Sequence, residues 1–373
     1  VANRVSFNLN LNGPSIAVDT ACSSSLVALL LACESILNGE CKAAIAGGVN
    51  LYLHPAKYIQ LCQLQMLSPT GRCYSFGKDA NGFVPGEGVG AVILKPLAAA
   101  KANGDKILGI ISGTAVNHSG RTNGYTVPDT RSQSQLLNSA LTKNNISPSS
   151  IGYIEAHGTG TKLGDPIEFS AINDIYSDNN DYQCAIGSIK SNIGHLESAA
   201  GIAGLIKVLL QMKHKTIVPS IGSDELNPAL SIQDSRFYIP HTNQDWDIYP
   251  ESGKRRSGLS SFGAGGANAH VVIEDDNNEH YSNDIKDGLL VFPFSARTEE
   301  QLRKLIISTH QLISNDEFKQ DFENNLVSLA YILQCGRVHH NYRLVIWASE
   351  QQEFIQALTS YITDKNIDNK HIL

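Results

Sequence analysis

The stretch VDTACSSSL, Val18 to Leu26, sets a single cysteine between a short apolar run and a hydroxyl-rich step. After it, apolar residues recur with helical spacing through LVALLLACESIL (26–37), which predicts a helix that starts next to Cys22. Before it, SIAVD (15–19) has the composition of a strand. Unpaired N–H groups at the helix start would lower the pKa of the Cys22 thiol and favour a nucleophilic thiolate. The pattern also fits a small buried residue at a strand–helix junction, the commoner use of a lone cysteine.

Strand-like runs alternate with helix-like stretches up to about residue 275, which predicts a layered α/β domain. The runs are SIAVD, AAIAGGVN (43–50), GAVILKPL (90–97), ILGIISGTAVN (107–117), IGYIEAHG (151–158), AIGSI (185–189) and AHVVIE (269–274). The acidic segment 274–287 is interpreted as a linker. A smaller unit with a β-α-α-β-α pattern follows, and we expect two domains, residues 1–275 and residues 276–373.

The first helix of the smaller unit carries a recognisable start signal. Thr298 and Gln301 form a capping-box pattern, and the apolar stripe that follows is expected to be buried. The members of this stripe are Leu302, Leu305, Ile306 and Ile313.

Composition excludes several classes of protein. The net charge of −7 argues against a general affinity for nucleic acid, and no apolar run is long enough to span a bilayer, so a cytoplasmic location is the default. The seven cysteines show no zinc-ligand spacing and are expected to be free thiols. The Gly-rich stretches lead into strands rather than helices, so no nucleotide cofactor is predicted. No metal is predicted either, because the sequence has no H-E-x-x-H motif and no Cys/His ligand spacing.

Two histidines lie in loops suited to chemistry. His157 follows the strand-like IGYI within EAHGTGTKLGDPIE (155–168), and the hydroxyls of Thr159 and Thr161 could bind the amides of a ligand. Asp165 and Glu168 are interpreted, with the intervening proline, as the capping residues of the next helix. A loop histidine is more often a structural hydrogen-bond donor than a catalyst.

The second histidine belongs to GSIKSNIGHLESAAGIAGLIKVLL (187–210). Lys190 and His195 precede an Ala/Gly-rich helix that is expected to pack very closely against its neighbours. The basic cluster GKRRSG (253–258) fits an acidic carrier protein or a phosphate, and it equally fits a solvated loop.

Four motifs together resemble the β-ketoacyl synthase family, in particular the ketosynthase domains of modular polyketide synthases. They are VDTACSSSL, HGTGTKLGDP (157–166), KSNIGHLESAAG (190–201) and SSFGAGGANAHVVIE (260–274), and they occur in family order. NGFVPGEGVGAVILKPL (81–97) is also similar, and NHSGRTNGYTVP (117–128) resembles systems whose acyltransferase is a separate protein, the trans-acyltransferase type. Residues 292–302 and 329–349 resemble the linker subdomain that follows such ketosynthases.

The resemblance implies a thiolase-like αβαβα fold with a small α/β linker subdomain. It also implies that the N-terminal part of the domain is missing, because only 21 residues precede Cys22, far fewer than in the family. An exposed sheet edge, exposed apolar faces and a poorly behaved, inactive fragment would follow.

The resemblance also implies the roles of the site residues. Cys22 would accept the acyl chain, and His157 and His195 would assist decarboxylation of a malonyl-type extender by binding the enolate oxygen. Lys190 would order the histidine loop, with Glu197 as a possible partner. The backbone N–H groups of Cys22 and Ala264 would form the oxyanion hole. The residues expected to contact substrate or pantetheine are Thr159, Thr161, Phe262, Gly263 and Ala264.

Partners and substrates follow from the same resemblance. Substrates would arrive on the phosphopantetheine of acyl carrier proteins, with no bound cofactor, and the domain would form a homodimer beside neighbouring polyketide synthase domains. Ala264 stands where similar fatty-acid enzymes carry a phenylalanine that gates the acyl tunnel, although it could also merely ease the packing of a Gly-rich turn.

Other members of the superfamily remain as alternatives. A fatty-acid β-ketoacyl synthase shares the Cys-His-His set but lacks the C-terminal linker module. A thiolase would carry a second catalytic cysteine, and residues 262–272 contain none. A chain-passing or docking domain that does not elongate typically lacks one of the histidines, whereas both are present here.

Overall fold

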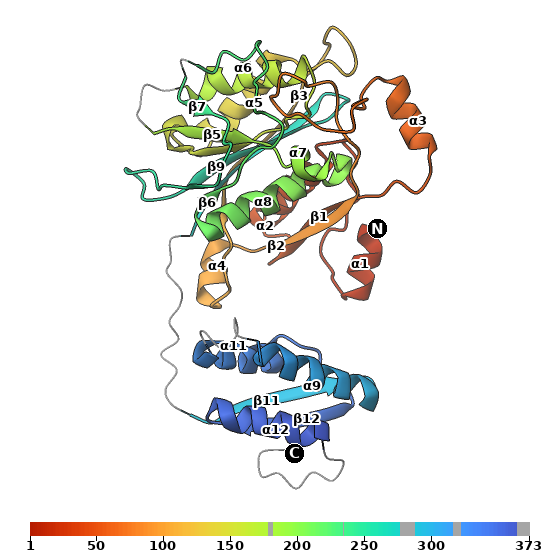
Figure 1. Ribbon diagram of the computed structural model, residues 1–373, viewed down its shortest axis with the longest axis vertical. Coiled ribbons are helices and arrows are strands. Elements are labelled where there is room, and N and C mark those ends of the chain that lie inside the picture. Colours follow the sequence, from red (N-terminus) through yellow and green to blue (C-terminus); the bar gives the residue numbers. More distant parts are fainter. Residues whose placement is uncertain (178–181, 234, 277–287, 316–321, 364–373) are drawn as a thin grey trace. The chain divides into compact units, whose positions relative to one another are not determined.

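The computed structural model describes residues 1–177, 182–233, 235–276, 288–315 and 322–363. The chain divides into two compact units, Val1–Glu279 and His280–Leu373 (Figure 1). Most of the expected linker, residues 277–287, lies outside the described residues, and the assignment of residues 1–275 and 276–373 to two domains stays a prediction. None of the helices in the described ranges is long and apolar enough to cross a membrane.

A six-stranded mixed sheet forms the centre of the first unit, in the order β3-β10-β9-β4-β5-β7. Strands β3, β10 and β9 are antiparallel neighbours, whereas β9, β4, β5 and β7 run parallel to one another. The carboxyl ends of β9, β4 and β5 therefore meet at one edge of the sheet. The bounds are β3 Ile110–His118, β4 Tyr153–Glu155, β5 Cys184–Gly187, β7 Phe237–Tyr238, β9 Arg256–Phe262 and β10 Ala267–Glu274.

Helices cover both faces of this sheet. Consecutive strand residues such as Tyr153 and Ile154 belong to different core clusters, because neighbouring side chains point to opposite faces. Helices α5 (Thr130–Thr142) and α6 (Gly164–Tyr176) pack on one face, and α2 (Ser24–Leu37) and α8 (Ala200–His214) pack on the other.

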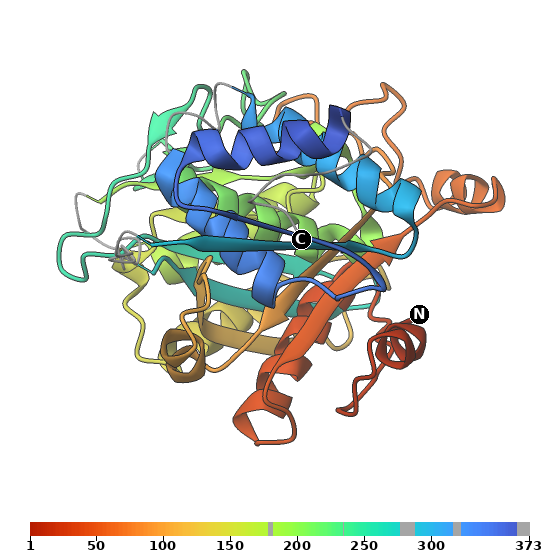
Figure 2. The same cartoon turned by 90° about the horizontal axis from the view of Figure 1, so that it is seen from below.

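A second, two-stranded sheet lies on the far side of α2 and α8. Its strands β1 (Ala44–Asn50) and β2 (Gly88–Leu94) are antiparallel, and Figure 2 shows them in orange. The first unit thus has the layer order α/β/α/β, with the outer face of β1–β2 apolar and exposed. On that face Ile45 pairs with Ile93 and Val49 pairs with Val89, and Val89 is 80% exposed. The exposed apolar face expected from the sequence is present.

The helix α8 packs as closely as its small residues predict. A Cβ atom at Gly201 would lie 2.5 Å from Cγ of Leu26 in α2, and one at Gly204 would lie 2.8 Å from Cδ1 of Leu259 in β9. Only glycine allows the helix to approach both neighbours at this distance. The strands and helices that complete the unit are α1 Ala2–Asn8, α3 Ala56–Gln63, α4 Leu97–Ala102, η1 Pro148–Ser150, α7 Lys190–Ile193, η2 Glu197–Ala199, β6 Thr216–Ile217 and β8 Gln244–Asp245.

One strand prediction was wrong, and one strand was not predicted. The run SIAVD does not form a strand, and Ile16 is exposed, because no described strand lies beside it to form a ladder. Strand β9, in contrast, has a sequence of small and polar residues and was not predicted. Ser257, Ser260 and Ser261 are buried in it, and each hydroxyl makes a hydrogen bond that offsets its loss of water.

The second unit has the expected β-α-α-β-α order: β11 Leu290–Ala296, α9 Glu299–Ile313, α11 Phe322–Cys335, β12 Tyr342–Ala348 and α12 Gln351–Thr363. Strands β11 and β12 form an antiparallel ladder whose buried face packs against the helices. Thr298 caps α9 by accepting from the Gln301 N–H group at 3.2 Å, as predicted. Of the predicted apolar stripe, Leu305 is 38% exposed and the other three residues are buried.

Candidate active site

The turn that carries Cys22 is held by the hydroxyl groups around it. Cys22 precedes Ser23, the N-cap of α2, and Ala21 has a φ of 54°. The Oγ atom of Ser24 accepts from the Thr20 N–H group at 2.9 Å, and the Oγ atom of Ser23 donates to the Thr20 carbonyl at 2.9 Å. The hydroxyl-rich sequence therefore fixes a sharp turn, and the turn presents the thiol at the start of the helix, as predicted.

The end of β9 holds this turn against the sheet. Ser261 donates its hydroxyl to the Cys22 carbonyl at 2.7 Å. A Cβ atom at Gly263 would lie 2.4 Å from the Thr20 carbonyl oxygen, so glycine is required for the close approach of the two segments. Gly263, which we expected to contact substrate, has this packing role within the chain.

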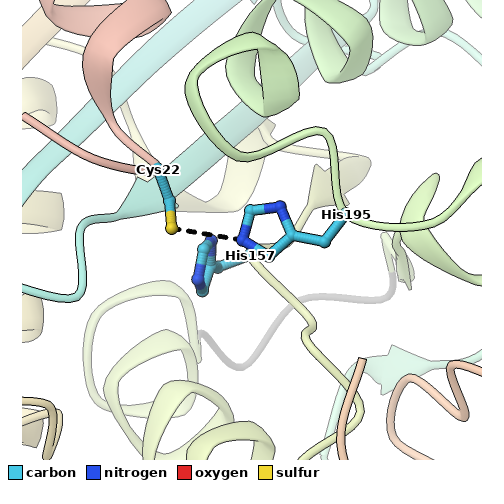
Figure 3. Close-up of side chains that lie close together, drawn as sticks. All are labelled: Cys22, His157 and His195. Atoms are coloured by element: carbon cyan, nitrogen blue, oxygen red, sulfur yellow. Dashed lines mark hydrogen bonds between the residues drawn. The ribbon is translucent and has the colours of Figure 1, made fainter. Parts of the chain in front are cut away.

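The two histidines converge on the thiol from separate loops (Figure 3). His157 follows β4, and His195 lies between α7 and η2. The Nε2 atom of His195 is 3.2 Å from Sγ of Cys22, and the two imidazole centroids are 5.6 Å apart in an edge-to-face arrangement. The structure therefore brings together three of the four predicted catalytic side chains at the edge where β4, β5 and β9 end.

Backbone hydrogen bonds select one tautomer of each histidine. The Nδ1 atom of His157 accepts from the Phe262 N–H group at 3.3 Å, and that of His195 accepts from the Glu197 N–H group at 2.9 Å. A backbone N–H group can only donate, so each Nδ1 atom is unprotonated and each neutral ring carries its proton on Nε2. Both rings thus offer an N–H donor; that of His195 points at the sulfur.

Burial and charge keep these imidazoles neutral. Loss of water lowers the pKa of His157 and of His195 well below the usual value, and the charge of Lys190 lowers both further. At neutral pH the site therefore holds two uncharged hydrogen-bond donors.

The expected depression of the thiol pKa was wrong. Burial raises the pKa of Cys22, and this effect outweighs the charge of Lys190 and the backbone N–H groups of Ala264 and Cys22, which lower it. The position of Cys22 at the helix start therefore does not make it a thiolate in the resting protein. The N–H group of Ala264, expected to belong to the oxyanion hole, is thus one of the two backbone groups that favour the ionised thiol.

Lys190 is buried, at 4% exposure, and lies behind the histidines. Its Nζ atom donates to the His157 carbonyl at 2.5 Å. Burial lowers the pKa of Lys190, whereas the carboxylates of Glu155 and Glu168 raise it. The suggested partner Glu197 binds elsewhere, to Tyr52 and Lys57.

Two carboxylates that sequence reasoning took for helix caps order the His157 loop. The oxygens of Glu168 accept from the N–H groups of His157 at 2.7 Å and Gly158 at 2.8 Å. Asp165 accepts from Phe76 and Gly160. Helix α6 starts before both residues, with Leu163 as N-cap, so their side chains are free to reach back over the loop. Burial raises the pKa of Asp165 to about 6 and that of Glu168 to about 7.

The remaining expected contact residues have local partners. Thr159 and Thr161 are half-buried, and the Thr161 hydroxyl accepts from the Gly164 N–H group at 3.1 Å. The Phe262 side chain packs in the core beside His157, with ring centroids 5.5 Å apart. Substrate contact by these residues stays a prediction.

The basic cluster at 254–256 is neither a free cationic site nor a solvated loop. Lys254 and Arg256 pair with Glu274, and Arg255 pairs with Asp275 at 3.1 Å. These ion pairs join the start of β9 to the end of β10, so the cluster has acidic partners within the chain.

The Cys-His-His cluster is close enough to be considered as a metal site. The Sγ atom of Cys22 and a ring nitrogen of each histidine lie within 4.8 Å of one another. A metal-bound histidine normally donates its other ring N–H to an acceptor, however, and here each Nδ1 atom faces a backbone N–H donor. The hydrogen bonds therefore favour donation from Nε2 over metal binding.

Family comparisons match most of the chain. The family described as "Beta-ketoacyl synthase, N-terminal domain" matches residues 1–100, and "Beta-ketoacyl synthase, C-terminal domain" matches residues 108–224. "Ketoacyl-synthetase C-terminal extension" matches residues 227–346.

Curated relatives are much longer than this chain. Polyketide synthase PksM of Bacillus subtilis is 47% identical over 97% of this chain, which spans 9% of that protein. Polyketide synthase ThaG of Burkholderia thailandensis is 46% identical over 97% of this chain and 6% of its own length.

Solved ketosynthases share the fold. The ketosynthase from module 6 of the bacillaene synthase of Bacillus subtilis superposes with a TM-score of 0.87 and 42% identity, covering 100% of this chain and 64% of that one. The oxazolomycin ketosynthase domain of Streptomyces albus gives a TM-score of 0.88 at 40% identity, covering 100% and 63%. The predicted thiolase-like α/β fold is confirmed.

Proposed function

This chain belongs to the β-ketoacyl synthase family, and from that membership we propose that it extends polyketide chains by decarboxylative Claisen condensation. The observation that carries the proposal is the meeting of Cys22 with the Nε2 donors of His157 and His195. The chain spans less than two thirds of the length of the relatives that it matches. The proposed activity is therefore that of a full-length ketosynthase with this sequence.

The first half-reaction transfers the acyl chain to Cys22. The sulfur attacks the thioester carbonyl carbon, and the developing oxyanion accepts from the backbone N–H groups of Cys22 and Ala264. The bond from that carbon to the carrier sulfur then breaks. The raised pKa of Cys22 means that the thiol proton must be lost, and the departing carrier thiolate can take it.

The second half-reaction removes CO2 from a malonyl-type extender. The bond between the extender's carboxylate and its C2 atom breaks, and its electron pair forms an enolate. The enolate oxygen accepts from the Nε2–H groups of His157 and His195, which are neutral and already oriented. The enolate carbon attacks the Cys22 thioester, the carbon–sulfur bond breaks, and the thiolate regains a proton from solvent.

Carriers and neighbours complete the proposed system. The acyl and extender groups arrive on the phosphopantetheine of acyl carrier proteins, and the residues proposed to contact them are Thr159, Thr161, Phe262, Gly263 and Ala264. A homodimer, a cytoplasmic location, neighbouring polyketide synthase domains and a separate acyltransferase are parts of the same proposal.

The test follows both half-reactions in one sample. The protein is incubated with an acyl thioester and a malonyl carrier protein, and mass spectrometry maps the acyl adduct and the β-ketoacyl product. We expect the adduct on Cys22, its loss in Cys22→Ala, and its retention in Cys62→Ala, which removes an exposed thiol. An adduct on another residue, or CO2 release without a β-ketoacyl product, contradicts the proposal.

A further inference from the structure

Glu197 adopts a backbone conformation that its side chain does not favour. Its φ is 40°, in the left-handed region, and it is the only such residue described in the loop between His195 and α8. A residue with a Cβ atom keeps this conformation only where surrounding contacts impose it. The strain therefore calls for a structural cause.

Two contacts hold the Glu197 carboxylate. The hydroxyl of Tyr52 donates to Oε1 at 2.7 Å, and Nζ of Lys57 lies 2.9 Å from Oε2. Tyr52 and Lys57 come from the segment between β1 and the end of α3, more than 130 positions earlier in the chain. We call the contacts of these three residues the Glu197 clamp. The Glu197 side chain is only 18% exposed, so its two contacts are partly shielded from water.

The clamp orients the group that selects the His195 tautomer. The strained backbone of Glu197 directs its N–H group at the His195 Nδ1 atom, 2.9 Å away. The His195 backbone is itself fixed, because its N–H donates to the Val84 carbonyl at 2.7 Å. With the His195 backbone fixed, the position of the Glu197 N–H group determines which ring nitrogen of His195 is protonated. When this N–H group donates to Nδ1, the proton is on Nε2, the atom that faces Cys22.

We propose that Glu197 is a positioning residue for the condensation step, which it serves by holding its own N–H group against His195 through the Glu197 clamp. It touches neither substrate nor the reacting sulfur. The inference rests on the proposed function for its effect on rate, but its effect on the imidazole can be measured without turnover.

Three substitutions at one position separate the components of the clamp. Glu197→Ala removes both contacts and keeps the strain, so condensation should fall about 10- to 100-fold while acylation of Cys22 is retained. Glu197→Gln keeps an oxygen for the Tyr52 hydroxyl and should retain most of the rate. Glu197→Gly removes the contacts together with the strain, because glycine adopts this φ freely, and should exceed Glu197→Ala in rate.

The tautomer is read by 15N NMR of histidine-labelled protein, with the His195 signals identified by their loss in His195→Ala. In the parent, the Nδ1 atom of His195 should have the shift of an unprotonated nitrogen. In Glu197→Ala a population protonated at Nδ1 should appear. The matched control is Lys78→Met, which breaks an exposed ion pair with Glu225 far from this loop in the sequence and should change neither readout.

The outcomes distinguish the two proposals. A parent protein that does not condense contradicts the proposed function, while its NMR spectra still test the clamp. An unchanged tautomer in Glu197→Ala overturns the positioning role. A loss of rate in Glu197→Gln as large as in Glu197→Ala, with the parental His195 tautomer retained in Glu197→Gln, also overturns it, because the carboxylate charge rather than the geometry would then be responsible.

Discussion

The Nε2 atom of His195 lies 3.2 Å from the Sγ atom of Cys22, although 173 positions separate the two residues in the chain. No single helix, strand or turn contains both residues. Cys22 is placed by a turn before α2, and His195 by a loop that pairs its backbone with Val84. The short distance therefore depends on the packing of α2 and α8 on one face of the sheet.

Removal of either imidazole should separate the two half-reactions. His157→Ala and His195→Ala should still acylate Cys22, and their rates of carbon–carbon bond formation should fall about 10²- to 10⁴-fold, because each removes a donor to the enolate. Single-turnover acylation and β-ketoacyl product formation are measured separately by mass spectrometry.

The control for these variants is His241→Ala, which removes an exposed histidine. It should behave like the parent in both assays. If either site variant forms product at the parental rate, its histidine does not stabilise the enolate.

Loss of the buried lysine should make the thiol harder to ionise. The charge of Lys190 lowers the pKa of Cys22, so Lys190→Met should shift the alkylation of Cys22 by iodoacetamide to higher pH. The measurement runs above pH 7, where both imidazoles stay neutral, and uses peptide mass spectrometry. Alkylation of the exposed Cys62 in the same molecules is the internal control. A shift of Cys22 to lower pH contradicts the assigned influence of Lys190.

Glu168→Gln should destabilise the loop that carries His157. Each carboxylate oxygen accepts one backbone N–H, whereas an amide would turn its NH2 group toward one of these donors. The free energy of unfolding should fall by about 1–3 kcal/mol, as measured by urea denaturation. Ser170→Ala changes an exposed residue of the same helix and should alter stability by less than about 0.5 kcal/mol. Equal stability of Glu168→Gln and the parent would mean that the loop is held by other contacts.

Ala264→Phe should restrict the acyl chain beside the thiol. Ala264 is half-buried, and its N–H group lowers the pKa of the Cys22 thiol. A ring at this position should clash with substituents near the acyl carbonyl but let a narrow chain pass. Acylation by an α-branched thioester should therefore fall more than acylation by a straight-chain one. Equal losses would indicate damage to the turn, and no loss would place the tunnel wall elsewhere.

The apolar outer face of β1–β2 should promote self-association. Val89 is 80% exposed and Ile93 is 76% exposed. The double variant Val89→Thr/Ile93→Thr keeps β-branched residues in β2 and lowers the apolar area of this face. It should sediment as smaller species than the parent at equal concentration. Val338→Thr, which changes an exposed valine of the second unit, is the control. Identical sedimentation of the double variant and the parent would show that this face does not associate.

The sequence predicted elements with strong periodicity and left out those held by polar contacts. Helix α2, strand β10 and the β-α-α-β-α order of the second unit follow from apolar patterns. Strand β9 does not, because its buried serines are stabilised by hydrogen bonds that no apolar pattern reports, such as that of Ser261 with the distant Cys22. The run SIAVD was predicted as a strand from its composition and is not one. A strand needs a hydrogen-bonded neighbour, and composition does not report whether a neighbour is present.

The residues of the candidate site could be predicted from the sequence, but the direction of the Cys22 pKa shift could not. Motifs identified Cys22, His157 and His195, and these residues do meet. The direction of the Cys22 pKa shift was wrong because burial, which no local pattern reports, outweighs the helix start and the charge of Lys190. The supporting role of Glu168 was hidden by its resemblance to a helix cap, and only the folded loop shows that it accepts from the N–H group of His157, 11 positions earlier.

The contacts at the end of β9 bear on which substitutions the candidate site can accept during evolution. Backbone groups of this strand and of the turn after it act on the candidate site: the Phe262 N–H group donates to Nδ1 of His157, and the Ala264 N–H group lowers the pKa of the Cys22 thiol. Backbone groups are retained whatever side chain is attached. Under the proposed function, substitutions at position 264 would therefore change which acyl chains are accepted while this N–H group is kept, so that substrate range could change without loss of catalysis.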